Sequence, residues 1–325
     1  MKGRISRVFW EGRDGKRPPP DAVFEWRPFY EGGFTLSNSS SQIDTLHSPA
    51  KAIPVLKRTF TPDREGWIER IEKALGAIGR KEIQKVVLAR TCILELAQIP
   101  DPFAIAAALK QKAQGAFIFC IETPGGAFLG ASPERLFFRK GREIFSEALA
   151  GTRRRGKTEE EDSALEKELL KSEKDLREVQ PVQDYLQRTL SPLCQIAPSF
   201  TPLSVHRTQN VQHLYSKCTS RLKEAISDSE IVSRLHPTPA LCGVPKEKAL
   251  SLIREWEPFD RGLYGGAIGW STPEASEWVV GIRSCLIQGR TATLFSGTGI
   301  VEGSDPKEEW DELDQKLKLY EGIFG

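Results

Sequence analysis

Two pairs of acidic residues are spaced so that their carboxylates could lie side by side. Asp175 and Glu178 form one pair, and Glu309 and Glu312 form the other. Residues at i and i+3 share one face of a helix, so each pair would present two carboxylates together. Carboxylates that converge from two helices suit Mg²⁺, which takes oxygen ligands, keeps several waters and often shares an anionic substrate. A solvated helix face rich in Glu and Lys would show the same spacing, so the pattern alone leaves both interpretations open.

Basic and small residues near the C-terminus could complement such a cation site. Arg283 is expected to end a strand of Val-Val-Gly-Ile, where a guanidinium could hold a carboxylate through two parallel hydrogen bonds. Gly297 and Gly299 would let the backbone approach a ligand closely. Lys316 follows Glu312 by one helical turn and could add a positive charge. A simple turn and an i, i+4 surface pair would also account for these residues.

Periodicity predicts the elements that carry these residues in the first half of the chain. Asp63 suits an N-cap, and apolar residues recur at helical spacing behind it, so 64–79 is predicted to be an amphipathic helix. Residues 85–94 are rich in β-branched side chains, which favours a strand. The remaining predictions are a helix over 102–113, a strand over 116–122, and a hairpin with strands over 127–131, 135–138 and 143–147 and a turn at Lys140-Gly141.

The second half of the chain is predicted to alternate helices with strands. One charged helix is expected over 158–190, kinked or divided at Pro181. The last helix should begin after Asp305, which caps it, and Pro306, which fits the first turn. The other predicted elements are a helix over 245–256 and strands over 263–271, 277–287 and 291–297.

These elements predict an α+β fold whose sheets carry helices on their outer faces. Short strands in series with tight turns favour antiparallel pairing. Residues 1–60 are rich in Pro, Ser and Gly and carry only weak strand signals such as 22–26. We therefore expect 1–60 to be a poorly specified segment at an edge of the fold and 61–325 to be the main domain.

Composition favours a small-molecule ligand. The 325 residues are 39% hydrophobic and 28% charged, as in a globular protein with a substantial core. The net charge is only +2 and no long single-sign block occurs, which argues against nucleic-acid and membrane partners. The basic start is not followed by an apolar stretch, so no signal peptide is expected. Six cysteines without Cys-x-x-Cys spacing predict reduced thiols in a cytoplasm rather than a zinc site or disulfides.

Seven motifs occur along the chain: Lys85-Val-Val-Leu-Ala-Arg90, Gly130-Ala-Ser-Pro-Glu-Arg-Leu-Phe137, Ala150-Gly-Thr152, Lys174-Asp-Leu-Arg-Glu178, His236-Pro-Thr-Pro-Ala-Leu-Cys-Gly243, Trp278-Val-Val-Gly-Ile-Arg283 and Gly297-Thr-Gly-Ile-Val301. Together, and in this order, they resemble the chorismate-utilising enzymes. The resemblance runs from about Asp63 to the C-terminus, and the N-terminal part looks shorter than is usual in the family. It implies large antiparallel sheets packed as a sandwich, with a chorismate-binding catalytic domain over 61–325.

The resemblance implies a reaction in which water adds at C2 of chorismate while the C4 hydroxyl leaves, with Mg²⁺ holding the ring carboxylate. Such chemistry needs a base and an acid. The family pattern assigns activation of the water to Lys85 and protonation of the departing hydroxyl to Glu134. Lys85 must then become transiently neutral, with its pKa lowered from about 10.4, and Glu134 must be protonated, with its pKa raised from about 4.3.

The resemblance also assigns binding roles. Glu178 and Glu312 would be direct or water-bridged Mg²⁺ ligands, with Asp175 and Glu309 supporting them. Arg283 would hold the side-chain carboxylate of the substrate. The other implied substrate-binding residues are Ala150, Gly151, Thr152, His236, Thr238, Leu241, Gly297, Gly299 and Lys316.

Two segments favour one branch of the family. Leu149-Ala-Gly-Thr152 lacks the nucleophilic lysine that aminodeoxychorismate synthases tend to carry there. The segment 236–243 differs from the Pro-Ala-Gly-Thr-Val-Ser-Gly of anthranilate synthases and looks like isochorismate synthase. The resemblance therefore implies a monomeric isomerase without an amidotransferase subunit, whose product could serve menaquinone or siderophore synthesis. A salicylate synthase, which goes on to eliminate pyruvate, is the alternative, ahead of an anthranilate synthase-type enzyme or a non-catalytic chorismate-binding protein.

Overall fold

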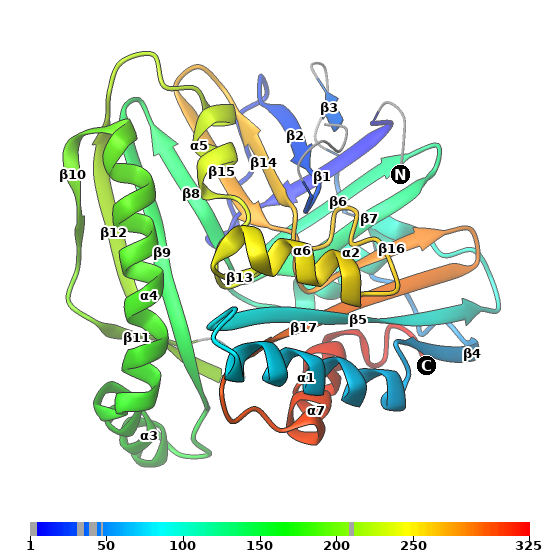
Figure 1. Ribbon diagram of the computed structural model, residues 1–325. Coiled ribbons are helices and arrows are strands. Elements are labelled where there is room, and N and C mark those ends of the chain that lie inside the picture. Colours follow the sequence, from blue (N-terminus) through cyan, green and yellow to red (C-terminus); the bar gives the residue numbers. More distant parts are fainter. Residues whose placement is uncertain (1–4, 31–35, 39–43, 47, 208–210) are drawn as a thin grey trace. The chain divides into compact units, whose positions relative to one another are not determined.

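The computed structural model describes residues 5–30, 36–38, 44–46, 48–207 and 211–325 (Figure 1). Side chains are described for all of these except residues 36–38, 150, 152, 174, 177 and 178. The chain forms two compact units. The first comprises residues 1–133, 237–267 and 281–325, and the second comprises residues 134–236 and 268–280. The domain boundary expected at residue 60 stays a prediction.

The first unit is built on an antiparallel sheet. In spatial order its strands are β1 (Arg7–Glu11), β6 (Phe117–Thr123), β7 (Gly126–Ser132), β16 (Ser284–Gln288), β17 (Thr291–Ile300), β5 (Lys85–Leu96) and β13 (Gly243–Val244), and β4 (Val55–Thr61) also pairs with β5. The ladder between β17 and β5 runs from Thr291 opposite Glu95 to Ile300 opposite Val86. In the N-terminal segment, β2 (Val23–Arg27) and β3 (Leu36–Asn38) pair with each other. The strand predicted over 85–94 is thus a central strand of this sheet.

Two helices of the first unit begin at the predicted capping residues. In α1 (Arg64–Gly79), Asp63 accepts a hydrogen bond from the Gly66 amide at 2.9 Å. In α7 (Pro306–Leu317), Asp305 accepts from two amides of the first turn. Trp67 of α1 meets Trp310 of α7 edge to face, with ring centroids 6.4 Å apart. The two helices therefore pack on each other, and Figure 1 shows them on one side of the β17–β5 pair.

Two further helices cover other parts of the same sheet. The predicted helices over 102–113 and 245–256 are observed as α2 (Pro102–Lys112) and α6 (Lys246–Trp256). α2 contacts β6 and β7 and contributes Phe103, Ile105 and Leu109 to a buried apolar cluster. α6 contacts β5 and β13, and Figure 1 shows it across the β17–β5 pair from α1. Helices therefore lie along both sides of this strand pair.

The second unit contains the second antiparallel sheet. In order its strands are β10 (Cys194–Phe200), β12 (Val211–Leu222), β9 (Glu143–Arg154), β8 (Arg135–Lys140), β15 (Ala275–Val280) and β14 (Ala267–Ser271), and β11 (Ser204–Arg207) pairs with β12. β8 and β9 form the hairpin predicted at Lys140-Gly141, where Gly141 has φ 56°. Helix α4 (Glu173–Leu190) contacts β9, β10 and β12. The α+β class with large antiparallel sheets is confirmed.

The charged segment 158–190 divides at Ser172 and not at Pro181. The structure has α3 (Glu159–Lys171) followed by α4, with Pro181 inside α4. Ser172 adopts φ −70° and ψ 108°, and its hydroxyl accepts from the Asp175 amide at 3.3 Å. An extended residue whose side chain caps the next helix ends one helix and starts another. The prediction that the helix divides at Pro181 was therefore wrong.

Several strands also differ from the predictions. The single strand expected over 277–287 is two strands, β15 and β16, which belong to different sheets. The strand over 127–131 lies in β7 of the first unit, whereas 135–138 begins β8 of the second, so these two do not pair with each other. Strands β10 to β12 and helix α5 (Asp228–Leu235) were not predicted, although β12 alternates buried with less buried residues.

The six cysteines are all buried and none forms a disulfide. Burial raises the pKa of the Cys242 thiol to about 12, which keeps it protonated and unreactive. The reduced state and the cytoplasmic location expected for these thiols stay predictions. Within the part of the chain that the structure describes, no helix combines the length and apolar character needed to cross a membrane.

Asp162 makes the stability of the second unit depend on pH in the acid range. Its carboxylate accepts from Arg155 Nε at 2.9 Å and from the Gly156 amide at 2.8 Å. These bonds lower the pKa of Asp162 from 3.8 to about 2. The ionised carboxylate therefore stabilises the folded state above pH 3.8, and this stabilisation is lost as the pH falls toward 2. We expect the unfolding temperature, followed by circular dichroism, to fall more steeply between pH 4 and 2 in the wild type than in Asp162→Asn. Glu159→Gln in the same helical turn is the control, and equal slopes for all three proteins would contradict the prediction.

Candidate functional site

The acidic pair of α7 meets a single hydroxyl of β17. Thr298 Oγ1 lies 2.5 Å from Glu309 Oε2 and 3.3 Å from Glu312 Oε1. The buried residues Trp310 and Leu313 hold α7 in place. The i, i+3 spacing therefore does place both carboxylates on one face of the helix, as predicted. Thr298 was not singled out from the sequence, although it stands between two glycines that were.

Lys316 brings a positive charge to the same pair. Its amino group donates to Glu312 Oε1 at 2.6 Å and to the Gly297 carbonyl at 2.7 Å. Burial alone would raise the pKa of Glu312, but Lys316 and Thr298 outweigh it, so this pKa lies below its ordinary value. Burial lowers the pKa of Lys316, and Glu312 offsets only part of that effect. Glu312 is therefore an anion at neutral pH beside a cation that is itself partly desolvated.

Lys85 lies across a glycine of the neighbouring strand. It is the first residue of β5 and is half-buried. A Cβ atom added to Gly299 of β17 would come within 2.7 Å of Lys85 Cε, closer than real Cβ contacts come, and within 3.2 Å of its Nζ. The missing side chain of Gly299 is thus what leaves room for the lysine. Gly299, one of the glycines predicted at the site, therefore makes room for a side chain of the neighbouring strand.

The sequence predicts that Arg283 ends a strand, but in the structure it lies outside the strands. It follows the end of β15 and precedes β16, with φ 51°. The Tyr320 hydroxyl donates to its carbonyl at 3.0 Å. Burial lowers the pKa of the Arg283 guanidinium, and the nearby groups Tyr264 and Glu312 act against that effect. A residue other than glycine in the left-handed region is strained, and such strain is found where surrounding structure imposes a special position.

Tyr264 is a candidate site residue that sequence reasoning missed. Its hydroxyl would lie 2.5 Å from a Cβ atom at Gly297, so it occupies the space above that glycine. Its ring stacks on Phe295, with centroids 5.0 Å apart and an interplanar angle of 10°. Burial raises its pKa to about 12, so it is a hydrogen-bonding phenol at neutral pH. The glycines that flank it in Arg-Gly-Leu-Tyr-Gly-Gly were the available signal.

The segment 236–243 divides between the two units. His236 caps the C-terminal end of α5 in the second unit and is 5% exposed. In the first unit, the Thr238 carbonyl accepts from the amides of Leu241 and Cys242, each at 3.0 Å, which closes a turn. The Thr238 hydroxyl is buried and finds no hydrogen-bond partner among the described residues. Buried hydroxyls are normally paired, so this one is a candidate to bind a ligand.

Gly151 of the second unit lies in a β-bulge. His213 pairs with Thr152 and Leu214 pairs with Ala150, which leaves Gly151 as the extra residue. Its φ of 66° favours glycine, as in the bulge type that places glycine first. A Cβ atom here would come within 2.9 Å of Asp175. The motif Ala-Gly-Thr therefore brings a bare backbone against α4, while the side chains of residues 150 and 152 lie outside the described part.

Asp175 is already held by an arginine. Arg153 Nη1 and Nη2 contact its two carboxylate oxygens at 3.2 and 2.7 Å, and Asp175 is 3% exposed. The side chain of Glu178 is outside the described residues. Glu134 precedes β8 and is half-buried, and its carbonyl accepts from the Val280 amide at 3.1 Å. Within the second unit, Asp175 is therefore paired with a guanidinium, and Glu134 is the acid that the family pattern suggests.

No group of three or more His, Cys, Asp and Glu side chains arranged to hold a metal occurs among the described residues. Glu309 and Glu312 nevertheless offer oxygen ligands beside a shared hydroxyl. Mg²⁺ is commonly bound through one or two carboxylates together with waters and substrate oxygens. The donor set of α7 therefore fits Mg²⁺ without requiring a closed cage of protein ligands.

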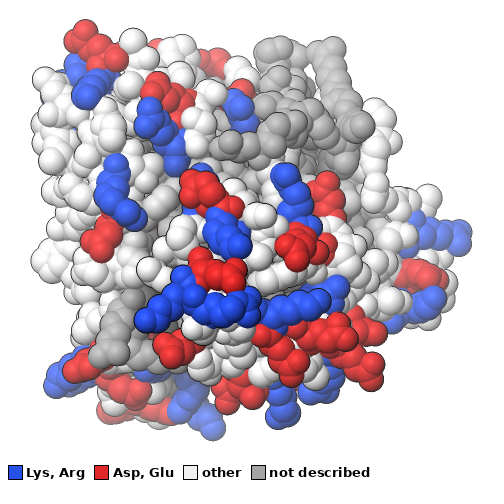
Figure 2. All heavy atoms as spheres, viewed as in Figure 1, with Lys and Arg blue, Asp and Glu red and all other residues white. Residues whose placement is uncertain are grey.

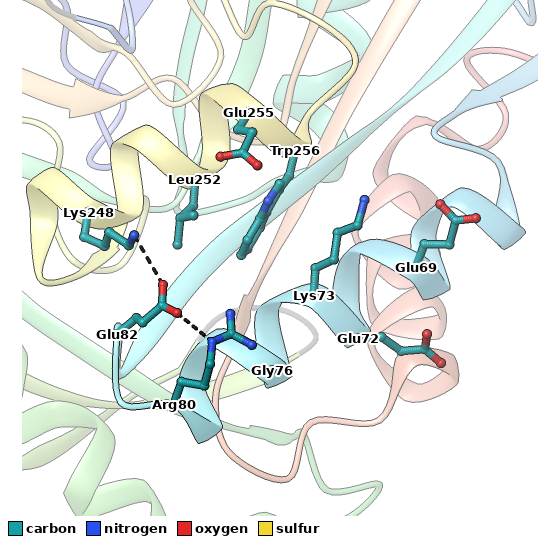
Figure 3. Close-up of a pocket in the computed structure, with 10 residues that line it drawn as sticks. All are labelled: Glu69, Glu72, Lys73, Gly76, Arg80, Glu82, Lys248, Leu252, Glu255 and Trp256. Carbon is teal, nitrogen blue, oxygen red and sulfur yellow. Dashed lines mark hydrogen bonds and ion pairs between the residues drawn. The ribbon is translucent and has the colours of Figure 1, made fainter.

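A separate surface groove lies between α1 and α6, with a volume of about 640 Å³ (Figure 3). Within it Glu82 contacts both Arg80, at 2.6 Å, and Lys248, at 3.2 Å. None of the predicted site residues lines this groove. Basic and acidic side chains are also interspersed on the face of the molecule drawn in Figure 2. The groove is thus a charge-compensated surface feature and not the candidate site.

Comparison with known proteins agrees with the motif resemblance. Residues 35–322 match the family model described as chorismate binding enzyme. Isochorismate synthase 2, chloroplastic, of Arabidopsis thaliana is 39% identical over 290 residues, which cover 88% of this chain and 52% of that protein. The isochorismate synthase MenF of Bacillus subtilis (strain 168) is 41% identical over 260 residues, which cover 79% of this chain and 55% of that protein. The chain therefore spans about half the length of these relatives.

Solved structures show the same fold. The menaquinone-specific isochorismate synthase of Escherichia coli superimposes with a TM-score of 0.87 at 27% identity, over 98% of this chain and 88% of that chain. Anthranilate synthase component I of Streptococcus pneumoniae, at 23% identity, shares the fold with a TM-score of 0.75 over 84% of this chain and 60% of that one. With the family match over residues 35–322, these likenesses show that the chain belongs to the chorismate-binding enzyme family.

Proposed function

We propose that the protein is an isochorismate synthase, an isomerase that converts chorismate into isochorismate. One water adds at C2 of chorismate and the C4 hydroxyl leaves as water, so the product has the mass of the substrate. The observation that carries the proposal is the placement of Lys85 against the bare backbone of Gly299. The relatives named as isochorismate synthases support it, because they align with most of this chain.

Lys85 is proposed as the base that activates the water. Lys85 is half-buried, and the absence of a side chain at Gly299 leaves room for its amino group. Glu134 is proposed as the acid that protonates the departing hydroxyl. Its backbone bond to Val280 fixes the start of β8 and so restricts where the carboxyl group can reach. A base and an acid on separate elements can act on the two ends of the same displacement.

Substrate carboxylates would be bound by the cationic and small residues of the first unit. The Tyr320 bond to the Arg283 carbonyl fixes the backbone from which its guanidinium extends, and the guanidinium is proposed to hold a substrate carboxylate. Tyr264 and Thr238 supply hydroxyl groups, and Thr238 has no partner among the described residues. From the second unit, Gly151 is proposed as a further contact, because the bulge presents backbone without a side chain there. We infer that these residues hold and orient chorismate.

Glu312 of α7 and Glu178 of α4 are proposed as direct or water-bridged Mg²⁺ ligands, with Glu309 and Asp175 supporting them. When bound, Mg²⁺ would supply positive charge that neutralises the ring carboxylate of the substrate. Lys316 and Thr298 lower the pKa of Glu312 and so keep it ionised, as a Mg²⁺ ligand must be. Because water is the proposed nucleophile, we propose that the protein acts without an amidotransferase subunit. The family resemblance suggests a monomer. The net charge of only +2 argues against nucleic-acid and membrane partners.

The product formed from chorismate tests the proposal directly. We expect purified protein to convert chorismate, in the presence of Mg²⁺, into an isomer of unchanged mass, and EDTA to abolish the reaction. Liquid chromatography with mass spectrometry distinguishes the outcomes. Salicylate with pyruvate would replace the proposal by a salicylate synthase, and aromatic amines that appear only with ammonia would indicate an anthranilate synthase-type enzyme. Binding without turnover would leave a chorismate-binding protein.

Lys85→Ala should separate binding from catalysis. Loss of a general base costs about 10²- to 10⁴-fold, so we expect the turnover number to fall by that factor. Chorismate binding, measured by isothermal titration calorimetry, should change little, because the lysine is assigned to the water and not to the substrate carboxylates. Lys57→Ala, which removes an exposed lysine of the neighbouring strand β4, is the matched control. A Lys85→Ala variant with wild-type turnover would remove Lys85 from the mechanism.

Gly299→Ala should displace the lysine without unfolding the protein. The new methyl group would meet the flexible end of Lys85, which can move aside, so stability should change little. Misplacement of a catalytic group by about 1 Å can cost about 10²-fold in rate, and we expect a fall of that order. Gly79→Ala at the end of α1 is the matched control, because nothing lies within 4 Å of its added Cβ atom. Steady-state kinetics and thermal unfolding of both variants measure the effect, and equal turnover in the two would count against it.

A further inference from the structure

Glu257 and Arg261 form a fully buried ion pair in the first unit. Each side chain is 1% exposed. Arg261 Nε donates to Glu257 Oε2 at 2.8 Å, and Nη2 donates to Oε1 at 2.5 Å, so the contact is bidentate. The guanidinium also lies over the Phe29 ring, 4.2 Å from its centroid. The pair follows α6 along the chain and precedes β14, and none of the motifs in the sequence analysis includes it.

The pair makes three further bonds, all to backbone groups distant in sequence. Arg261 Nη1 donates to the Leu241 carbonyl at 3.0 Å, and Nη2 donates to the Val87 carbonyl at 2.7 Å. The Ala89 amide donates to Glu257 Oε1 at 2.8 Å. Two charged side chains thus tie together strand β5 and the turn that contains Leu241.

Each of these segments carries a candidate site residue. Val87 is two residues from Lys85 on β5, and the Leu241 carbonyl belongs to the turn closed by Thr238. The Arg261 carbonyl accepts from the Tyr264 amide at 2.8 Å, which sets the start of the turn that carries this phenol. The ion pair is therefore hydrogen-bonded to the segments that carry the proposed base and two proposed substrate contacts.

Stability alone is a weak reason for such a pair. Burying two charges carries a large desolvation penalty, and replacing a buried pair by packed apolar side chains is often neutral or stabilising. What an apolar pair cannot do is direct hydrogen bonds to chosen backbone atoms. The five bonds of this pair fix the position of the 238–242 turn along β5, and each bond has a specified direction.

We propose that Glu257 and Arg261 are positioning residues for the chorismate site. They set the distance between Lys85 and the turn that contains Thr238 and Leu241. This role rests on the proposed function, because it concerns the same substrate. Neither side chain reaches the solvent, so neither is a catalytic residue. The Val87 amide donates to the Cys242 carbonyl at 2.8 Å. This bond joins β5 to the 238–242 turn, and the ion pair keeps the two segments in the position that allows it.

The test uses two variants of the full chain. Arg261→Lys keeps the charge but loses the planar fork that reaches Glu257, Val87 and Leu241 together. The double variant Glu257→Gln with Arg261→Met removes both charges, so no unpaired ion is left if the single variant fails to fold. We expect kcat/KM for chorismate to fall about tenfold to a hundredfold, mainly through KM. The Mg²⁺ concentration for half-maximal activity should stay within twofold of wild type, because the five hydrogen bonds given above for the pair reach neither β17 nor α7.

A matched control separates positioning from general destabilisation. Leu109→Ala removes apolar volume from α2 of the same unit and lowers the unfolding temperature without touching the pair. Below its unfolding temperature this control should retain wild-type KM. Amide hydrogen exchange gives a second readout that needs no turnover, and we expect faster exchange over 238–244 and 85–89 in the pair variants only.

The outcomes are distinguishable. Absence of turnover in the wild type would defeat the proposed function. Wild-type turnover with unchanged KM and unchanged exchange in the double variant would overturn the positioning role alone. Faster exchange with unchanged KM would also overturn it, because the pair would then order the turn without serving the reaction. A higher KM in both Arg261→Lys and the double variant, together with faster exchange over 238–244 and 85–89, would support it.

Discussion

The register between β17 and β5 is the constraint on which the first unit depends. It places Gly299 opposite Val87 and Thr298 opposite Leu88. Because side chains alternate along a strand, the two glycines at 297 and 299 face one side and Thr298 faces the other. Lys85 can therefore lie over Gly299 while Thr298 meets the carboxylates of α7. A slip of one residue would exchange the two faces and separate both contacts.

The elements that the sequence predicts well are those fixed by local chemistry. Asp63 and Asp305 cap their own first turns, so the starts of α1 and α7 follow from neighbouring residues. The β-branched run over 85–94 likewise identifies β5, because its burial on both faces permits few other side chains. The i, i+3 spacing of Glu309 and Glu312 was sufficient to place them together. In each case the interaction that decides the structure lies within one helical turn or one strand.

What the sequence could not predict depends on contacts between distant segments or on competition between two local signals. Pro181 signals a break, but the serine cap at Ser172 ends the helix earlier, and α4 tolerates the proline. Arg283 sits between strands of two different sheets, which no local pattern indicates. The Glu257–Arg261 pair joins residues up to 174 positions apart, so its bonds follow from the fold and not from spacing. The roles of Lys85 and Glu134 came from family resemblance and stay proposals.

The two acidic pairs have the same spacing but different surroundings. On α7, Thr298 and Lys316 contact the carboxylates from one side, and Glu312 remains 51% exposed. On α4, Arg153 occupies both oxygens of Asp175, which is nearly enclosed. A cation that approached Asp175 would have to displace a bidentate guanidinium, whereas one that approached Glu312 would meet an accessible carboxylate. If Mg²⁺ binds as proposed, this difference suits Glu312 to direct ligation and Asp175 to the supporting role.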